Sequence, residues 1–188
     1  MRFTAIDKPK GLLLKIAYYL SKKQFGKVLT VFKVIYARST PVLQATIKII
    51  RTEEKLSISK SLRQFIRYYT SHLNDCPFCA NTNAYQAAKD KNQLQEWKEF
   101  MNYRESQKFS EKEKALLAYL EEVNLTKTAA DGTFAELTRH FSEKEIVEIT
   151  WLNAVENYFN LMAKPLQVPS DNLTTNPSPD SKWNHNNF

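Results

Sequence analysis

The scarcity of glycine is the feature that most restricts the fold of this chain. Only three glycines, Gly11, Gly26 and Gly132, occur in 188 residues. β-Sandwiches and barrels need many tight turns, and Rossmann and P-loop phosphate sites need clusters of glycine. Both classes are therefore disfavoured. We expect an all-α fold in a compact multi-helix domain, because a chain of this length suffices for one hydrophobic core rather than two.

Helix-start signals recur along the chain. Ser110 and Ser142 are each followed three residues later by glutamate, the pattern of a capping box. Apolar residues then recur every three or four positions. The last helix carries apolar residues on two faces, which predicts a central place in the core or at a subunit interface. We predict helices at residues 10–22, 26–36, 41–53, 57–72, 76–90, 93–103, 111–123, 131–140 and 143–163.

Charge and composition divide the chain into three segments. We expect residues 1–25 to form a basic amphipathic helix that packs on the domain. We expect residues 26–164 to form the helical domain, and residues 165–188 to form an irregular tail rich in proline and asparagine. Trp183 and Phe188 are expected to pin this tail to a neighbouring surface. Residues 1–70 carry a net charge of +12, and residues 71–164 carry −4. The cations are spread over helices, which favours solvated faces or an acidic protein partner over nucleic acid.

No stretch of the sequence approaches the roughly 18 consecutive apolar residues of a membrane-spanning helix. The apolar run at 12–20 is followed by Ser-Lys-Lys rather than by the small residues of a signal-peptide cleavage site. We therefore expect a cytoplasmic protein without a membrane span.

Both cysteines lie in one short motif, Cys76-Pro77-Phe78-Cys79. Proline is favoured as the first residue of a helix, which makes Cys76 approximately the cap and places Cys79 in the first turn. Unpaired N–H groups and the helix dipole stabilise a thiolate there, and the thiolate is the form that attacks peroxides and disulfides. A second thiol nearby can close a disulfide. The motif therefore predicts redox chemistry.

Two other interpretations of the cysteines remain. They could be an inert buried pair, or they could bind zinc. A structural zinc site needs four Cys or His ligands, and only His72 and His140 are available to complete one, so we predict no metal and no cofactor. A thioredoxin would also need a βαβ pattern, which is missing.

Three stretches together resemble the carboxymuconolactone decarboxylase-like superfamily, in its alkylhydroperoxidase D-type branch that bears a C-x-x-C motif. The first is the helix at 57–72 that leads into the motif, the second is the cysteine helix itself, and the third is residues 141–160 with their aromatic and asparagine ending. The resemblance covers roughly residues 26–170.

This resemblance implies an all-helical subunit that assembles into trimers or hexamers and acts as a thiol-dependent peroxidase or disulfide reductase. In the family, the second cysteine attacks the peroxide and the first resolves the sulfenic acid, which implies that Cys79 attacks and Cys76 resolves. It also implies a small hydroperoxide substrate and a reductant that is a lipoylated or thioredoxin-like dithiol protein.

The chain departs from the family pattern at two positions. Asn83 stands where the family has a histidine four residues after the second cysteine, and Gln64 stands where it has a glutamate about twelve residues before the first. The family groups relay the thiol proton, whereas amides form hydrogen bonds but take up no proton at neutral pH. His72 is a candidate substitute base or a histidine that caps a helix end. Phe78 is expected to line the site.

Three functions are therefore open. The first is an antioxidant peroxidase or disulfide reductase that uses Cys79 and Cys76. The second is a disulfide-exchange or thiol-switch protein that has lost the family relay, which Gln64 and Asn83 favour. The third is a basic adaptor that binds nucleic acid or an anionic membrane through residues 1–70. Its binding affinity would then fall steeply as the salt concentration rises.

Overall fold

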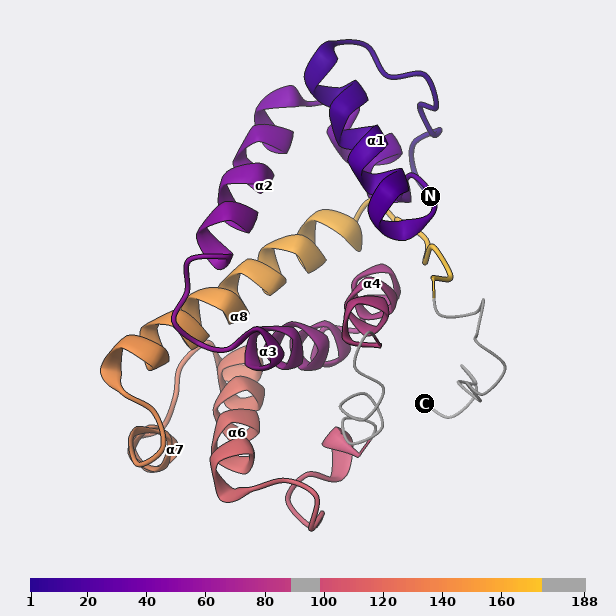
Figure 1. Cartoon of the computed structure of the whole chain (residues 1–188). Helices are drawn as coiled ribbons and strands as arrows, with labels where there is room; N and C mark the ends of the chain where they lie inside the picture. Colours follow the sequence, from indigo (N-terminus) through magenta and orange to yellow (C-terminus); the bar gives the residue numbers. More distant parts are fainter. Residues whose placement is uncertain (89–98, 174–188) are drawn as a thin grey trace.

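Helices make up the regular structure of the residues that the structure describes, which are 1–88 and 99–173 (Figure 1). No strand occurs in these ranges of the computed structural model, so the predicted all-α fold is confirmed for them. The elements are α1 (Leu12–Phe25), the π-helical turn η1 (Phe32–Tyr36), α2 (Thr40–Glu53), α3 (Lys60–Leu73), α4 (Pro77–Ala87), the 3-10 turn η2 (Phe100–Asn102), α6 (Glu111–Thr126), α7 (Asp131–Thr138) and α8 (Glu143–Ala163).

Helix α8 runs between the two ends of the molecule. Figure 1 shows α7 near its N-terminal end and α1 near its C-terminal end, with α3 crossing between them. Helix α3 packs against both α4 and α8. The capping boxes predicted for α6 and α8 are both formed, with Ser110 paired to Glu113 and Ser142 to Glu145.

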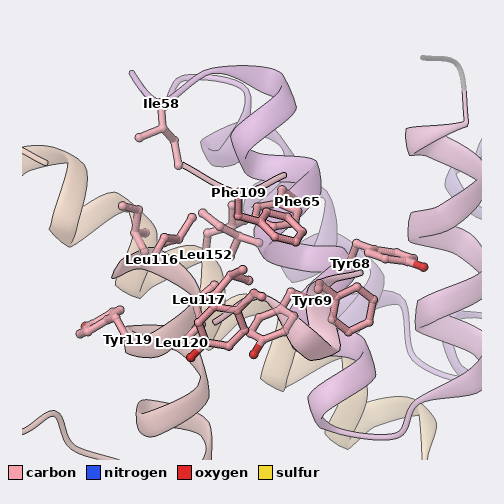
Figure 2. Close-up of a cluster of buried hydrophobic side chains, with 14 of the residues drawn as sticks. Ile58, Phe65, Tyr68, Tyr69, Phe109, Leu116, Leu117, Tyr119, Leu120 and Leu152 are labelled. Atoms are coloured by element: carbon pink, nitrogen blue, oxygen red, sulfur yellow. The ribbon is translucent and has the colours of Figure 1, made fainter. Parts of the chain in front are cut away.

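One hydrophobic core joins α3 to α6 and α8. Figure 2 shows Phe65 and Tyr69 of α3 together with Leu117 and Leu120 of α6, and all four side chains are buried. Burial of each such side chain stabilises the fold by roughly 1.5–3 kcal/mol. This core therefore fixes the position of α3, whose end leads into the cysteine motif.

A second core surrounds the cysteines. Leu14 of α1, Val34 of η1 and Leu43 of α2 are buried in it with both cysteines. Val168, which follows α8, belongs to the same cluster. The cysteine motif is thus enclosed by segments from the two ends of the described chain.

Two buried carboxylates hold loops against this helical frame. Asp171 accepts hydrogen bonds from the backbone N–H and the hydroxyl of Thr30, both at 2.8 Å. Glu148 of α8 accepts hydrogen bonds from the N–H groups of Ser57 (2.8 Å) and Ile58 (3.1 Å). Both carboxylates thereby satisfy backbone donors that precede or begin a helical segment.

Besides shifts of up to three residues at other helix ends, the structure differs from the predicted helices at residues 26–29 and 57–59. Residues 26–29 are not helical, because Gly26 takes a left-handed φ of 74° that ends α1, and the Ser21 hydroxyl accepts from the Leu29 N–H. Helix α3 begins at Lys60 rather than at 57, because Ser59 caps it and Glu148 holds the preceding residues. The side chain of one residue far along the chain decides that boundary.

Two sequence predictions lie partly or wholly outside the described residues. The predicted helix at 93–103 is described only from residue 99, where Phe100–Asn102 forms a 3-10 turn. Trp183 and Phe188 also lie outside the described part of the chain.

On the second apolar face of α8, the Leu161 side chain is 71% exposed. Among the residues described, no helix is long and apolar enough to span a bilayer.

We predict that Asp171→Ala lowers the free energy of unfolding by about 2–4 kcal/mol, because it leaves the Thr30 donors without their buried partner. Urea denaturation followed by circular dichroism measures this. The matched control is Asp7→Ala, whose exposed ion pair with Lys33 should contribute less than about 1 kcal/mol. Equal losses in the two variants would contradict the role of Asp171.

Candidate functional site

The turn between α3 and α4 positions the two cysteines. Asp75 adopts a left-handed φ of 46°, and the Cys76 N–H donates to the Ser71 carbonyl at 3.0 Å, which reverses the chain. Cys76 is the N-cap of α4, and Pro77 is its first residue. Cys79 consequently lies in the first turn, as the sequence predicts.

Cys76 and Cys79 form a disulfide, with their Cα atoms 5.3 Å apart. Their exposed fractions are only 2% and 5%. The two sulfur atoms are thus placed within bonding reach by one turn of helix. The Cα separation lies in the range that protein disulfides adopt.

A cavity of about 380 Å³ lies against the cysteine helix. Cys79, Phe78 and Asn83 line it, whereas Cys76 is not among the described residues that do. A volume of this size is typical of sites for small organic molecules. The apolar wall is contributed mainly by α1, the following loop and turn, α2 and α8, through Phe25, Leu29, Val31, Phe32, Tyr36, Ile50, Phe159, Met162 and Ala163.

A charged network forms the polar wall of the cavity. The Arg67 guanidinium donates through Nε to Glu156 and through Nη1 to Glu53, both at 2.9 Å. Arg67 also lies over the ring of Phe159, 5.1 Å from its centroid. The planar guanidinium suits this combination of two carboxylates and one aromatic face. Helices α2, α3 and α8 are therefore joined by one cation.

Glu156 is the most deeply buried member of this network, with 1% of its surface exposed. Its Oε1 atom accepts from the side-chain amides of Asn160 (2.8 Å) and Asn83 (3.2 Å). Burial raises the pKa of Glu156, and the charge of Arg67 with these hydrogen bonds opposes that rise. Burial would lower the pKa of Arg67, but the charges of Glu156 and Glu53 outweigh it and raise that pKa.

Three of the side chains singled out from the sequence meet at the cavity. Gln64, Phe78 and Asn83 all line it together with Cys79. The Gln64 amide donates to the Gln86 carbonyl at 3.4 Å.

His72 lies elsewhere, outside the described lining of the cavity. Its ring packs against Tyr68, with the centroids 4.5 Å apart, and against Phe100 at 5.0 Å. Burial lowers the pKa of His72 to about 4, and the charge of Asp75 opposes this only in part. The histidine therefore belongs to the first core rather than to the cysteine cavity.

Sequence reasoning missed Arg67 and Glu156. A signal was present, because each is a charged residue within a run of apolar and aromatic residues, Phe65-Ile66-Arg67-Tyr68 and Ala154-Val155-Glu156. Charged residues in such runs are rarely buried unless they are paired. That pattern predicts a buried ion pair but does not identify which charges form it.

No family model and no curated protein matches the sequence. Solved structures do match the fold. A protein of unknown function from Agrobacterium tumefaciens, described as a candidate AhpD antioxidant defence protein, is 25% identical with a TM-score of 0.66, over 72% of this chain and 94% of that one. An AhpD-core, peroxidase-related protein from Ralstonia eutropha JMP134 is 18% identical with a TM-score of 0.77, over 92% and 93%.

The chain has the AhpD-type fold. The predicted resemblance to the carboxymuconolactone decarboxylase-like superfamily is thereby confirmed for the fold, while membership of the branch with two redox cysteines stays a prediction. The debrominase Bmp8 shares the AhpD-type fold at 16% identity and a TM-score of 0.77, over 90% of this chain and 92% of that one. Its cysteine-to-alanine variant, in complex with 2,3,4-tribromopyrrole, gives a TM-score of 0.78 at 15% identity, over 90% and 91%.

We predict that His72 contributes a distinct pH dependence to stability. Its pKa is about 4 in the folded chain and about 6.5 when exposed, so the unfolded state binds more protons between these values. Above about pH 6.5 the histidine is neutral in both states and does not change the free energy of unfolding. Toward pH 4 the unfolded state takes up the proton first, which lowers the free energy of unfolding by roughly 3 kcal/mol. Denaturation across this range should show a shallower slope for His72→Asn. Parallel curves for the variant and the wild type would contradict the assignment.

Proposed function

We propose that this protein is a thiol-dependent oxidoreductase that reduces an organic hydroperoxide through the Cys76–Cys79 pair. The observation that carries the proposal is a C-x-x-C disulfide with Cys79, rather than Cys76, on the wall of a largely apolar cavity. The AhpD-type fold of the peroxidase-related neighbours supports it. The lining favours an organic peroxide over a small polar one, because the apolar part of the substrate is removed from water on binding.

The reaction balances as follows. The Cys79 thiolate attacks the terminal peroxide oxygen, so that an S–O bond forms, the O–O bond breaks, and the leaving oxygen takes a proton to become the alcohol. The Cys76 thiol then attacks the sulfenic sulfur, and the disulfide forms with loss of water. A dithiol partner protein, lipoylated or thioredoxin-like, supplies two electrons and two protons that restore both thiols. Assembly into trimers or hexamers remains part of the proposal.

A second candidate function is thiol-dependent reductive dehalogenation of an aromatic ring. The fold shared with the debrominase Bmp8 and the aromatic lining of the cavity favour it. The Cys79 thiolate would take the halogen from carbon, a proton would replace it there, and Cys76 would displace halide to give the disulfide. As in the peroxidase reaction, a dithiol partner would supply the two electrons that reduce the disulfide again.

We predict that the pre-reduced wild-type protein consumes cumene hydroperoxide much faster than a free thiol, and that Cys79→Ser removes this rate. Cys76→Ser should react once and stop, with a dimedone-trapped sulfenic acid at residue 79, because the resolving thiol is gone. Stopped-flow peroxide assays and mass spectrometry measure both. If Cys76→Ser reacts with peroxide no faster than Cys79→Ser, the assigned order of the two cysteines is wrong.

The same preparation separates the alternatives. Release of bromide from 2,3,4-tribromopyrrole without consumption of peroxide would favour the dehalogenase. Disulfide formation with an oxidised dithiol, without turnover of either substrate, would identify a disulfide-exchange protein or thiol switch.

A further inference from the structure

A carboxylate from a different helix reaches the place where the family relay is missing. Asn83 follows Cys79 by about one turn of α4, and its amide donates to Glu156 of α8 at 3.2 Å. The same amide donates to the Arg67 carbonyl at 3.1 Å. Asn83 is thus held from two sides, and it holds the Glu156 carboxylate next to the cysteine helix.

Glu156 and Cys79 line the same cavity. The Gln64 and Asn83 side chains line it too, but neither amide takes up a proton at neutral pH. His72, the substitute base suggested by the sequence, packs in the first core instead. Glu53 and Glu54 also line the cavity. Of these three carboxylates, Glu156 is the one that accepts a hydrogen bond from a side chain of the cysteine helix, that of Asn83.

The charges around Glu156 suit a proton acceptor. Glu53, Arg67 and Glu156 together carry one negative charge when both acids are ionised, and uptake of one proton makes the group neutral. A neutral buried group avoids the desolvation cost of an unbalanced charge. Burial also raises the pKa of Glu156, which makes it a better proton acceptor than an exposed glutamate.

We propose that Glu156 is the proton-transfer residue of the Cys79 reaction. This inference rests on the proposed peroxidase function. Glu156 accepts the Cys79 thiol proton through a water molecule in the cavity, and it returns that proton to the oxygen that leaves when the O–O bond breaks. The carboxylate is regenerated in each turn, so no further acid or base is consumed. The relay carboxylate of the family pattern, on the helix before the cysteines, is replaced here by one on α8.

The test compares two reagents on the reduced protein, because only one of them needs a proton for its leaving group. Cumene hydroperoxide releases an alkoxide that must be protonated, whereas iodoacetamide releases iodide, which needs no proton. Both reagents react with the Cys79 thiolate, so we predict that Glu156→Gln slows alkylation at pH 7 and slows the peroxide reaction more, with a total loss of about 100-fold or more, because the leaving alkoxide also loses its proton donor. Toward high pH, where the thiol ionises alone, the alkylation rate of the variant should recover, while its peroxide rate stays below that of the wild type.

Glu148→Gln is the matched control, since Glu148 is a buried carboxylate of the same helix that caps Ser57 and lies outside the cavity lining. It should lower stability and leave the peroxide rate per folded molecule unchanged. Asn83→His in the Glu156→Gln background should restore part of the peroxide rate, because it installs a titratable group one turn after Cys79.

Three outcomes would overturn the proposal. An unchanged peroxide rate in Glu156→Gln would show that the carboxylate is not needed. A loss of the peroxide reaction and alkylation by the same factor, without recovery of alkylation toward high pH, would show that Glu156 only supports the structure. A wild-type protein that is alkylated at Cys79 but consumes no peroxide would overturn the peroxidase function itself, and this role with it.

Discussion

The polar wall of the cavity depends on one largely buried cation, the Arg67 guanidinium. Helices α2 and α8 each supply it with a carboxylate, Glu53 and Glu156, and α8 also supplies the ring of Phe159 beneath it. Removal of one partner from such a group leaves an uncompensated charge in the interior, which costs several kcal/mol. The three helices must therefore close around Arg67 together. Because α4 follows α3 after a tight turn, the cysteines are positioned by the same constraint.

The molecule has two hydrophobic cores, and the cysteines belong to only one of them. The core around Phe65 and Leu117 is built mainly from α3, α6 and α8, with Ala84 and Ala87 of α4, and does not include the cysteines. The core around Cys76 and Cys79 is built from α1, η1, α2 and the segment after α8. Differences in the segments of the second core can thus alter the cavity while the first core keeps its packing, which agrees with a fold shared by proteins that carry different names.

The sequence predicts well what local chemistry decides and less well what distant pairing decides. The start of α4 at Pro77 and the capping boxes at Ser110 and Ser142 follow from neighbouring residues, and the structure confirms them. The start of α3 depends on Glu148, about ninety residues further along the chain. The family resemblance points to Gln64 and Asn83, because they stand where the family has its relay residues. Glu156 was not, because its link to Asn83 is a contact between separate helices that periodicity does not encode.

The segment after α8 also has a consequence for how the protein can be handled. The Leu173 N–H donates to Asn81 of α4 at 2.8 Å, and the Arg2 N–H donates to the Leu166 carbonyl at 3.1 Å. Asn81 lies between Cys79 and Asn83 in sequence. The segment after α8 is therefore attached to the cysteine helix at Leu173 and to the N-terminal segment at Leu166. A variant truncated after residue 165 would lose these attachments, and water would reach the disulfide. The reactivity of its thiols would then differ from that of the 188-residue chain.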